Sequence, residues 1–291
     1  MTSHTLRTLV STEVLAEHLS DPDWVLLDCR HDLFKPEAGG AEYGKAHIPG
    51  ARFMHMDHDL AGPKTGRNGR HPLPDAAVFA AKLDAAGIGA GTQVIAYDAQ
   101  DGTNASRLWW MLRWAGHDAV AVLDGGWPKW AREHRPCSAE PTRRPPTTFA
   151  PAKAGTGTGV GDEARVDSAY ILSHLEGQDM LLVDARSAER YRGEAEPIDP
   201  VAGRIPGAVC RFFKHNLDGQ GCFRSPAELR ADFIAILGEH PPVHAVHSCG
   251  SGVSACHNLL AMEIAGLTGS RLYPGSWSEW CADPLRPIAR G

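Results

Sequence analysis

One stretch of the chain decides its fold class, and it reads Val243-His244-Ala245-Val246-His247-Ser248-Cys249-Gly250-Ser251-Gly252-Val253-Ser254-Ala255. Its first residues form a short apolar run, which predicts a buried strand over Val243–His247. The residues after the two glycines predict a helix over Val253–Ala265 that ends near Gly266. Strands that alternate with helices indicate a mainly parallel α/β sheet, in which ligands bind beyond the carboxyl ends of the strands. Cys249 lies at such an end.

The loop that begins at Cys249 has the composition of an anion-binding cradle. Gly250 and Gly252 allow positive φ angles and let backbone N–H groups approach the sulfur. The sulfur also precedes the positive end of a helix dipole, and both effects favour the thiolate over the thiol. A nucleophilic sulfur held in this way is typical of sulfur-transfer and phosphoryl-transfer enzymes. The alternative is a buried, inert cysteine before a helix.

A long internal repeat extends this pattern over the whole chain. Val25-Leu26-Leu27-Asp28-Cys29-Arg30 returns as Leu181-Leu182-Val183-Asp184-Ala185-Arg186, and the Gly-x-Trp-x-x-Trp pattern of Asp124–Trp130 returns in Tyr273–Trp280. We therefore predict two tandem domains, each a mainly parallel sheet flanked by helices. They span residues 6–135 and 166–290, and a linker rich in Pro, Thr, Gly and Ala joins them over residues 136–165.

Other apolar and amphipathic runs complete the alternation. Strands are expected over Trp24–Asp28, Thr92–Tyr97 and Leu181–Asp184, and helices over Asp75–Ala86, Ala105–Ala115 and Ser225–Leu237. Asp98 stands in the first repeat where Cys249 stands in the second, and an acidic loop follows it. We therefore predict one active site, in the C-terminal domain, beside a catalytically inactive copy.

Bulk properties narrow the functional classes. The chain has 291 residues and a formal net charge of −6, which argues against nucleic acid as a partner. No apolar run is long enough for a membrane helix, and the N-terminus lacks the pattern of a signal peptide, so we expect a cytoplasmic protein without a membrane partner. The odd count of seven cysteines favours free thiols. No Cys-x-x-Cys pair occurs and the His55–Asp59 cluster lacks a known ligand spacing, so we expect no metal and no cofactor.

With these motifs the chain resembles the two-domain rhodanese-family sulfurtransferases over roughly residues 6–290. The resemblance is carried by Asp184-Ala185-Arg186, by Ile205-Pro206-Gly207-Ala208, by the Cys249 loop and by the Gly-x-Trp-x-x-Trp ends. The loop is most similar to that of 3-mercaptopyruvate sulfurtransferases, which usually carry Thr where Ser254 stands. Relatives that prefer thiosulfate typically carry two cationic residues where Gly250 and Ser251 stand.

This resemblance implies a double displacement. Cys249 takes the sulfane sulfur of 3-mercaptopyruvate as a persulfide and passes it to a thiol or to cyanide. The loop residues that would bind the substrate are Gly250, Gly252, Val253, Ser254 and Ala255. Partners are thus a small-molecule sulfur donor and acceptor, and a thioredoxin-like reductant is a further candidate. Thiosulfate is the alternative donor.

The family also places an arginine for the donor carboxylate shortly after the Asp-x-Arg motif, and here that residue is Arg190. Arg186 is expected to form a buried ion pair instead. A second substrate-binding arginine is expected after an acidic-Pro pair, but Ile198 stands there, which puts the choice of donor in doubt. The candidates to replace it are Arg192, Arg204 and Arg211.

The leaving enolate must gain a proton, and the resemblance suggests a relay of Ser251, His71 and Asp57. His71 and Asp57 would come from the first domain. A loop histidine that bonds to backbone, and a carboxylate that caps a helix, are the structural alternatives for these two residues.

Two other functions fit parts of the sequence. A cysteine phosphatase needs Cys-x5-Arg to clamp phosphoryl oxygens, and Ala255 stands at that position. A non-catalytic binding module, or a sulfur-relay module that serves a protein acceptor, would keep the fold with less chemistry.

Overall fold

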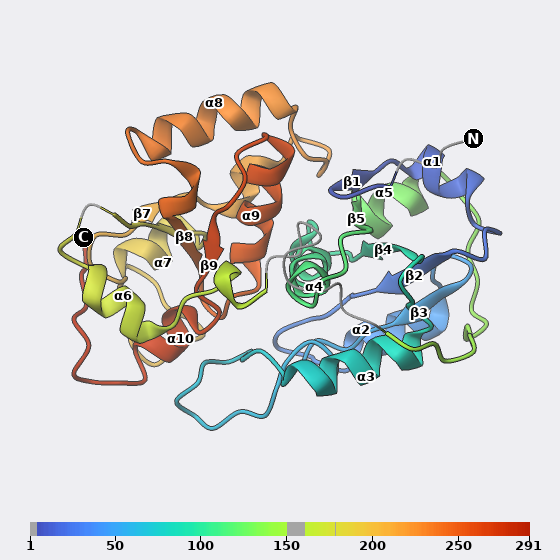
Figure 1. The fold of residues 1–291 in the computed structure, drawn as a ribbon, viewed down its shortest axis with the longest axis horizontal. Coiled ribbons are helices and arrows are strands. Elements are labelled where there is room, and N and C mark those ends of the chain that lie inside the picture. The colour runs from blue at the N-terminus through green and yellow to red at the C-terminus, as the bar shows by residue number, and fades with distance from the viewer. Residues whose placement is uncertain (1–4, 150–160, 178) are drawn as a thin grey trace. The chain divides into compact units, whose positions relative to one another are not determined.

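The computed structural model describes residues 5–149, 161–177 and 179–291 (Figure 1). The described residues divide into two compact units. The first takes those within Met1–Gly62, Pro74–Gly161 and Gly219–Cys222. The second takes those within Pro63–Leu73, Asp162–Asp218 and Phe223–Gly291. The short segment Pro63–Leu73 comes from the N-terminal half of the sequence and nevertheless belongs to the second unit, which matters for the site below.

The first unit is built on a parallel sheet of five strands in the order β1-β5-β4-β2-β3. The strands are β1 (Leu9–Val10), β2 (Trp24–Asp28), β3 (Ala51–Phe53), β4 (Gln93–Tyr97) and β5 (Val120–Leu123). Its helices are α1 (Thr12–Glu17), α2 (Ala38–Lys45), α3 (Ala76–Ala86), α4 (Thr103–Trp114) and α5 (Gly126–Arg132).

The second unit repeats this arrangement with a parallel sheet of four strands in the order β7-β6-β8-β9. The strands are β6 (Leu181–Asp184), β7 (Val209–Cys210), β8 (Ala245–Ser248) and β9 (Arg271–Leu272). Its helices are α6 (Ser168–His174), α7 (Ala188–Arg192), α8 (Pro226–Leu237), α9 (Ser254–Ile264) and α10 (Ser276–Trp280). Short 3-10 turns cover Asp162–Ala164, Phe213–Asn216 and Pro242–His244.

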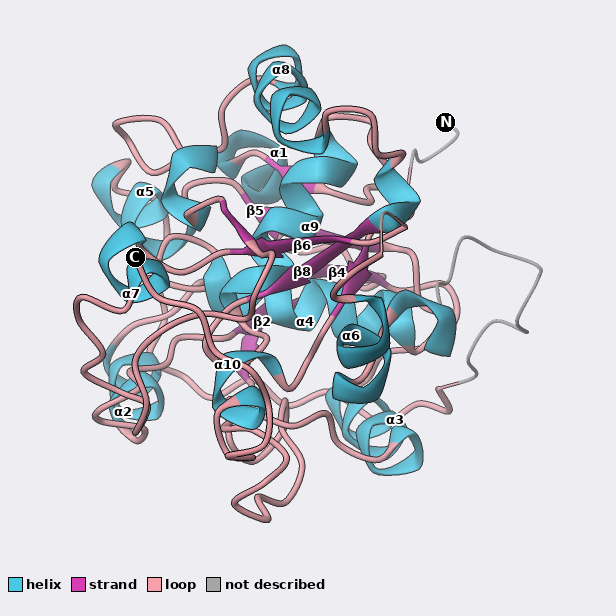
Figure 2. Cartoon of the chain, turned by 90° about the vertical axis from the view of Figure 1, so that its left-hand side faces the viewer, coloured by secondary structure: helices cyan, strands magenta, loops and turns pink. Residues whose placement is uncertain are grey.

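Helices cover both faces of the second sheet (Figure 2). On one face, Ile171 of α6 and the two tryptophans of α10 pack with Leu182 and Val246 in one apolar cluster. On the other face, apolar side chains of α8 and α9 pack against Ala245. Strands that are buried on both faces must be apolar throughout, which is why these strands were recognisable in the sequence as continuous hydrophobic runs. The predicted fold class, two parallel α/β sheets flanked by helices, is confirmed.

Local boundaries follow from capping and from one short turn. Asp75 caps α3 by accepting from the N–H groups of Ala77 and Val78, and Ser225 begins α8 with a capping box. The strand predicted over Val243–His247 begins only at Ala245, because the preceding residues form a 3-10 turn and Val243 is 52% exposed.

Helix starts were also misplaced by a few residues. Helix α4 begins at Thr103 rather than Ala105, and α9 begins at Ser254 rather than Val253, which is its N-cap. Both differences lie at helix starts. The first residue of a helix is set by capping and not by the periodicity of the apolar residues.

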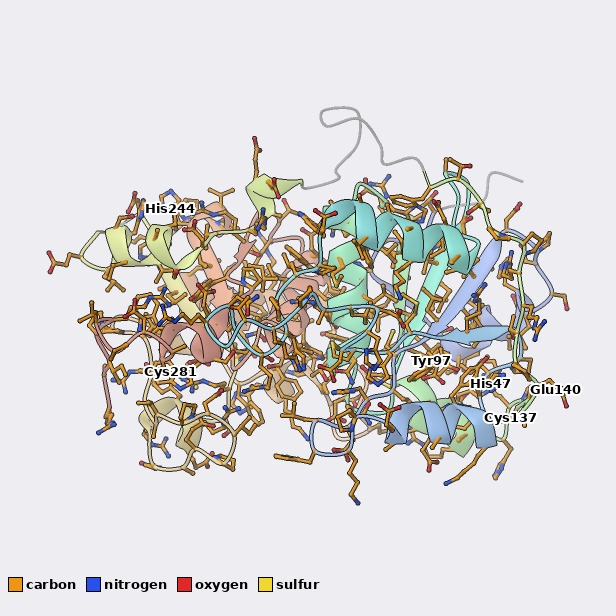
Figure 3. The ribbon with its side chains drawn as sticks, turned by 90° about the horizontal axis from the view of Figure 1, so that it is seen from below. His47, Tyr97, Cys137, Glu140, His244 and Cys281 are labelled. Carbon is orange, nitrogen blue, oxygen red and sulfur yellow. The ribbon has the colours of Figure 1, made fainter. Side chains whose placement is uncertain are left out.

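Part of the predicted linker, residues 150–160 with its Gly155–Gly159 run, lies outside the described residues. The part that precedes it packs on the first unit. Ser138 forms an antiparallel bridge with His47, and the His47 Nε2 atom lies 3.1 Å from the carbonyl oxygen of Glu140 (Figure 3). Arg144 Nη1 donates to the carbonyl of Trp24 at 2.8 Å. Backbone and side-chain bonds therefore hold residues 136–149 along this unit. Among the described helices, none has the length and apolar character needed to span a membrane.

Candidate active site around Cys249

The backbone of Cys249 is fixed at the carboxyl end of β8. Strand β8 lies between β6 and β9 and ends at Ser248, so Cys249 is the first residue beyond an interior strand. Its N–H group donates to Ser276 Oγ at 3.0 Å, and its carbonyl accepts from the N–H of Trp277 at 2.9 Å. The Cys249 residue is 2% exposed. The start of α10 therefore fixes the backbone of the cysteine through two hydrogen bonds.

The sulfur of Cys249 accepts a hydrogen bond from the backbone. The Gly252 N–H group donates to Sγ at 3.1 Å. Gly252 has a φ of +76° and Val253 one of −87°, and a left-handed residue followed by a right-handed one turns successive N–H groups toward one side. No side chain among the described residues caps α9, so a capping group does not occupy its first N–H groups. The loop thus presents the Gly252 N–H group to the sulfur.

The first unit shows what the equivalent loop binds. There the carboxylate of Asp98 fills the cradle. Its Oδ1 atom accepts from the N–H groups of Gln100 and Gly102 at 2.8 and 2.9 Å, and its Oδ2 atom accepts from those of Asn104 and Ala105 at 2.7 and 2.9 Å. Burial raises the pKa of Asp98, and these four backbone bonds act against that rise. This loop before a helix therefore holds a negative group with backbone amides.

Two of the three predicted relay residues lie together in the second unit. The Nδ1 atom of His71 lies 2.8 Å from Ser251 Oγ, and both residues are buried. His71 lies within the sequence range predicted for the first domain, and the segment around it, Pro63–Leu73, packs with the second unit. The N–H of Arg70 donates to Ser278 Oγ at 2.9 Å, and a Cβ on Gly69 would lie 2.9 Å from the carbonyl oxygen of Gly275.

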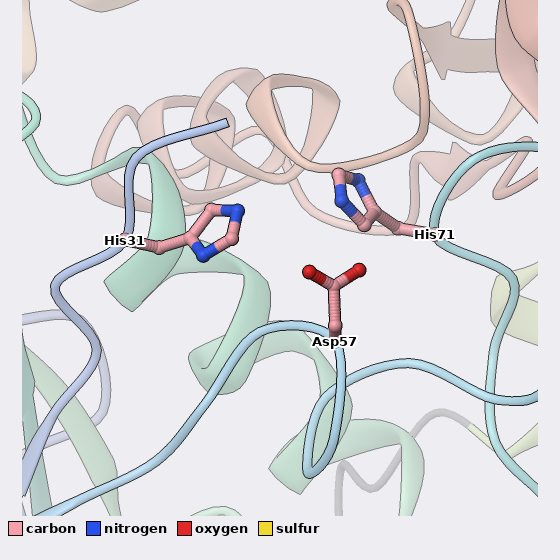
Figure 4. Close-up of side chains that lie close together, drawn as sticks. All are labelled: His31, Asp57 and His71. Atoms are coloured by element: carbon pink, nitrogen blue, oxygen red, sulfur yellow. The ribbon is translucent and has the colours of Figure 1, made fainter. Parts of the chain in front are cut away.

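Asp57, the third predicted member, belongs to the first unit. There it is half-buried, its N–H donates to His55 Nδ1 at 3.1 Å, and its carboxylate comes within 4.8 Å of a ring nitrogen of His31 (Figure 4). Figure 4 also draws His71, which is part of the other unit. The link from Asp57 to the relay stays a prediction.

The His55–Asp59 cluster, which the sequence analysis considered as a metal site, forms hydrogen bonds and an ion pair within the first unit. His55 Nδ1 accepts from the backbone N–H of Asp57 at 3.1 Å. The Asp59 Oδ1 atom pairs with Lys82 at 2.8 Å, and its Oδ2 atom accepts from the N–H of His55 at 2.8 Å. These contacts give the cluster a structural role in the first unit.

Arg190, to which the family resemblance assigns substrate binding, lies beside the Cys249 loop. A Cβ added to Gly250 would be 3.5 Å from both Nη atoms of Arg190. Glu196 holds this guanidinium through both carboxylate oxygens, at 2.7 Å in the shortest contact, and Asp199 Oδ2 lies 3.1 Å from its Nη2 atom. The carboxylates therefore orient Arg190 toward the loop.

Arg186 forms the buried ion pair that the sequence predicts. Its Nη2 atom lies 2.7 Å from Asp184 Oδ2, and both side chains are almost fully buried. Burial acts to lower the pKa of Arg186, but Asp184 and Glu196 outweigh it and raise that pKa. Arg186 thus stays charged and anchors the loop after β6.

The three arginines suggested as replacements at position 198 are bound elsewhere. Arg192 pairs with Glu194 at 2.7 Å, Arg204 donates to the carbonyl of Gly291 at 2.6 Å, and Arg211 pairs with Asp232 at 2.9 Å. The second guanidinium at the loop is that of Arg70, which sequence reasoning missed. A Cβ on Gly250 would lie 2.9 Å from Arg70 Nη2. The only sequence signal was its position next to His71.

Ser276 is a second residue that sequence reasoning missed. It has a φ of +52°, is fully buried, and its Oγ both accepts from the N–H of Cys249 and donates to the carbonyl of Tyr273 at 2.9 Å. The repeat contained the signal, since Gly126 occupies the equivalent position with a φ of +54°. A serine in place of a glycine at a left-handed position indicates that its side chain is needed there.

These observations define a class: a duplicated parallel α/β protein in which a cysteine after a central strand accepts a backbone hydrogen bond, and in which two arginines and a serine–histidine pair lie at the same loop. The chain belongs to the rhodanese-like domain family of sulfurtransferases, because that domain matches twice, over residues 11–133 and 167–283. A relative in Pseudomonas aeruginosa that is named as a 3-mercaptopyruvate sulfurtransferase is 45% identical over 287 residues, which cover 97% of this chain and 98% of the relative.

Other relatives differ in the donor for which they are named. The thiosulfate sulfurtransferase of Bos taurus is 34% identical, with 94% of this chain and 92% of the relative covered. Among solved structures, SseA from Escherichia coli, described as a 3-mercaptopyruvate sulfotransferase, matches with a TM-score of 0.78 and 30% identity over 92% of this chain and 98% of that chain. The predicted family is confirmed, and the donor needs its own argument.

Proposed function

We propose that this chain is a 3-mercaptopyruvate sulfurtransferase that carries the transferred sulfur as a persulfide on Cys249. The observation that carries the proposal is the 3.1 Å hydrogen bond from the Gly252 N–H to Sγ, at the start of a helix without a side-chain cap. A backbone donor aimed at a sulfur stabilises negative charge there without a mobile cation. The relative in Pseudomonas aeruginosa supports the choice of donor.

The first step conserves atoms and charge. The Cys249 thiolate attacks the sulfur of mercaptopyruvate, an S–S bond forms, and the C–S bond breaks with its electron pair on the carbon. The carbon fragment is the enolate of pyruvate, which takes up one proton. In the second step an acceptor thiolate or cyanide attacks the outer sulfur, and the Cys249 thiolate is restored.

Each residue of the loop has a separate role in this reaction. Gly250 has no side chain, so the guanidinium groups of Arg70 and Arg190 come close to the loop there, and Gly252 supplies the amide that bonds to the sulfur. The amides of Val253, Ser254 and Ala255 at the start of α9 would stabilise charge on the persulfide. Arg190 would bind the carboxylate of the donor, because it is directed toward Gly250 by buried acids.

Ser251 and His71 would handle the proton. Their 2.8 Å contact is short enough for a proton to pass between Oγ and Nδ1. The family resemblance implies Asp57 as the third member of this relay. Loss of the proton source should lower kcat with mercaptopyruvate, because its leaving enolate must gain a proton. It should lower kcat less with a donor whose leaving group needs no proton. A His71→Asn variant that uses mercaptopyruvate and thiosulfate with equally reduced kcat would argue against the relay.

Thiosulfate is the competing donor, and one observation favours it: two guanidinium groups lie beside Gly250. Comparison of kcat/KM for the two donors on the purified protein decides between them. We expect mercaptopyruvate to be the better donor. A clear preference for thiosulfate would overturn that choice and leave the persulfide chemistry intact.

The persulfide itself is tested by mass spectrometry. Protein treated with mercaptopyruvate should carry one added sulfur atom on Cys249, and Cys249→Ser should lose both that sulfur and all turnover. Cys137→Ser is the matched control, because Cys137 is a free thiol that is exposed. Added sulfur on Cys137 and none on Cys249 would contradict the proposal.

Further parts of the proposal concern the rest of the chain. The first domain, residues 6–135, would be non-catalytic because Asp98 fills its cradle, and residues 166–290 would carry the reaction beyond the 136–165 linker. A small thiol, cyanide or a thioredoxin-like reductant would accept the sulfur. Cytoplasmic location stays a prediction from the sequence.

A further inference from the structure

We propose that the first unit binds a small zwitterionic α-amino acid in a cavity beside the carboxyl ends of β2 and β4. The cavity has a volume of about 240 Å³. This is slightly below the roughly 300–1,000 Å³ of typical ligand pockets, so the cavity suits a small molecule. The lining residues that matter for recognition all belong to the first unit, and they are Arg30, Asp32, Glu42, Gln100 and Trp127.

The topology of the first sheet places this cavity where parallel α/β proteins bind ligands. After β2 the chain adds β3 on one side of that strand and then returns to add β4 on the other side. A crevice forms outside the carboxyl ends of the strands where the direction reverses. Arg30 and Asp32 follow β2, and Gln100 follows β4. The second sheet reverses in the same way between β6 and β8, where Cys249 lies, so the cavity is the counterpart of that site.

Arg30 keeps one donor for a ligand. Its side chain is only 5% exposed, and its Nη2 atom lies 2.7 Å from Asp28 Oδ2 and donates to the carbonyl of Ala46 at 2.7 Å. The Nε atom also donates to Asp28, whereas Nη1 forms no hydrogen bond within the described part of the chain. In the second unit the equivalent atom, Arg186 Nη1, lies 3.4 Å from a carboxylate oxygen of Glu196. A ligand carboxylate would supply the acceptor that the first unit lacks at this donor.

Gln100 offers a second donor in the same cavity. Its Oε1 atom accepts from the N–H groups of His31 and Ala99 at 3.4 and 3.3 Å and from Asn104 Nδ2 at 3.2 Å. These three bonds fix the orientation of the amide, and its Nε2 group has no hydrogen bond to any residue that the structure describes. A guanidinium and an amide N–H group together suit the two oxygens of a carboxylate.

Two carboxylates on the same cavity indicate an ammonium group at the other end of the ligand. Asp32 Oδ1 accepts from the N–H groups of Phe34 and Lys35 at 2.8 and 3.1 Å. Its Oδ2 atom forms no hydrogen bond or ion pair among the described residues. Glu42 pairs with Lys45 at 2.7 Å through Oε1. The Oδ2 atom of Asp32 is therefore left as an acceptor for a ligand N–H group.

The charge balance favours a ligand that carries an ammonium group. Arg30 is matched by Asp28, and Glu42 is matched by Lys45. Asp32 then leaves the cavity with excess negative charge. A simple anion such as thiosulfate is repelled by this charge, whereas a zwitterion can place its ammonium group near Asp32 and its carboxylate near Arg30.

The walls of the cavity are formed before a ligand binds. The guanidinium of Arg30 lies over the ring of Trp127, 4.7 Å from its centroid. Helix α2 packs so closely on the chain after β2 that a Cβ on Gly39 would overlap the carbonyl oxygen of Arg30. Little conformational entropy is therefore lost on binding, which helps a small ligand with few contacts.

The test uses L-serine and two analogues that each lack one charged group. Ethanolamine lacks the carboxylate, and 3-hydroxypropanoate lacks the ammonium group. In calorimetric titrations of the full chain we expect a Kd of about 1 mM or tighter for L-serine. Each analogue should bind at least about 10-fold more weakly, because each loses hydrogen bonds to a charged group.

Two substitutions at the cavity separate the two ends of the ligand. Asp32→Asn keeps the oxygen that accepts from backbone N–H groups and removes the charge, so it should weaken serine about 10-fold and leave 3-hydroxypropanoate within about threefold. Gln100→Glu keeps the acceptor and replaces the amide donor with a negative charge, so it should weaken serine and strengthen ethanolamine. Asp23→Asn is the matched control, because Asp23 is an exposed residue of the same unit that does not line the cavity, and it should leave every Kd unchanged.

Hydrogen exchange locates the bound amino acid. Serine should slow exchange in peptides that cover residues 28–32 and 98–102, and not in peptides that cover residues 249–255. Protection confined to the Cys249 loop, ethanolamine binding as tight as that of serine, or no binding of serine up to about 10 mM would each overturn the proposal. Equal losses of serine affinity in Asp32→Asn and Asp23→Asn would do the same. These measurements involve no sulfur transfer, so their outcome is independent of the proposed function.

Discussion

Replacing Gly252 with alanine tests whether the loop geometry holds the sulfur. Gly252 has a φ of +76°, and a Cβ there would lie 2.4 Å from the carbonyl oxygen of Pro274 and 2.9 Å from its Cα. These are backbone atoms that cannot turn aside. The loop must shift by at least about 0.6 Å to bring the shortest contact from 2.4 Å to 3.0 Å.

The cost can be worked from these two effects. A left-handed conformation costs an L-residue about 1–2 kcal/mol, and overpacking against a fixed neighbour costs about 1–3 kcal/mol. We therefore expect Gly252→Ala to lower the free energy of unfolding of the second unit by about 2–5 kcal/mol. Because the Gly252 N–H is the donor to Sγ, kcat should also fall, by about 100-fold if that donor is lost.

Gly250→Ala is the comparison within the same loop. Gly250 has no positive φ, and its added Cβ would meet the side-chain ends of Arg70 and Arg190 and not backbone atoms. For Gly250→Ala the free energy of unfolding should change by no more than about 0.5 kcal/mol, and the main effect should be on KM for a carboxylate donor. Urea-dependent hydrogen exchange on peptides that cover β8 and α9 measures the second unit alone. Equal stability losses in the two variants, or full kcat in Gly252→Ala, would refute the reasoning.

Three further substitutions test residues that stabilise the two equivalent loops and strand β8. Asp98→Asn should cost the first unit about 2–4 kcal/mol in urea denaturation, because two buried N–H groups lose their acceptors; Asp23→Asn, on an exposed residue, should cost less than about 0.5 kcal/mol. Ser276→Ala keeps the positive φ and loses the bond to Cys249, so it should destabilise more than Ser276→Gly; the reverse order contradicts this. Burial lowers the pKa of the His247 imidazole to about 3, whereas its pKa in the unfolded chain is about 6.5. As the pH falls below about 6.5, the imidazole therefore takes up a proton in the unfolded chain and not in the folded one. Wild-type stability should then fall by up to about 1.4 kcal/mol per pH unit from this group, and His247→Leu should show a shallower slope.

The fold was predictable because its signals are local. Strands β2 and β6 have the predicted bounds, since a strand buried on both faces is apolar throughout. The repeat then extended the pattern to a second sheet. Boundaries that depend on one turn were not predictable: Val243 is apolar and β-branched, yet it is exposed in a 3-10 turn before β8.

The site was predictable only where it is continuous in sequence. The Cys249 loop and the start of α9 form one stretch, so composition revealed them. Arg70 reaches Asp199 across 129 residues and His71 reaches Ser251 across 180, and no periodic pattern encodes such contacts. Several arginines follow β6, and the sequence does not show which of them is bound to a carboxylate elsewhere.

The two repeats together explain why the cysteine is chemically useful. In the first, four amides bond to the carboxylate of Asp98, so the cradle is filled by the protein itself. In the second, a cysteine replaces the carboxylate, and its single sulfur accepts from Gly252. A sulfur occupies less of the cradle than a carboxylate does, and the amides at the start of α9 have no capping side chain among the described residues. An outer sulfur on Cys249 would extend toward those amides, so the cradle is better matched to the persulfide than to the free thiol.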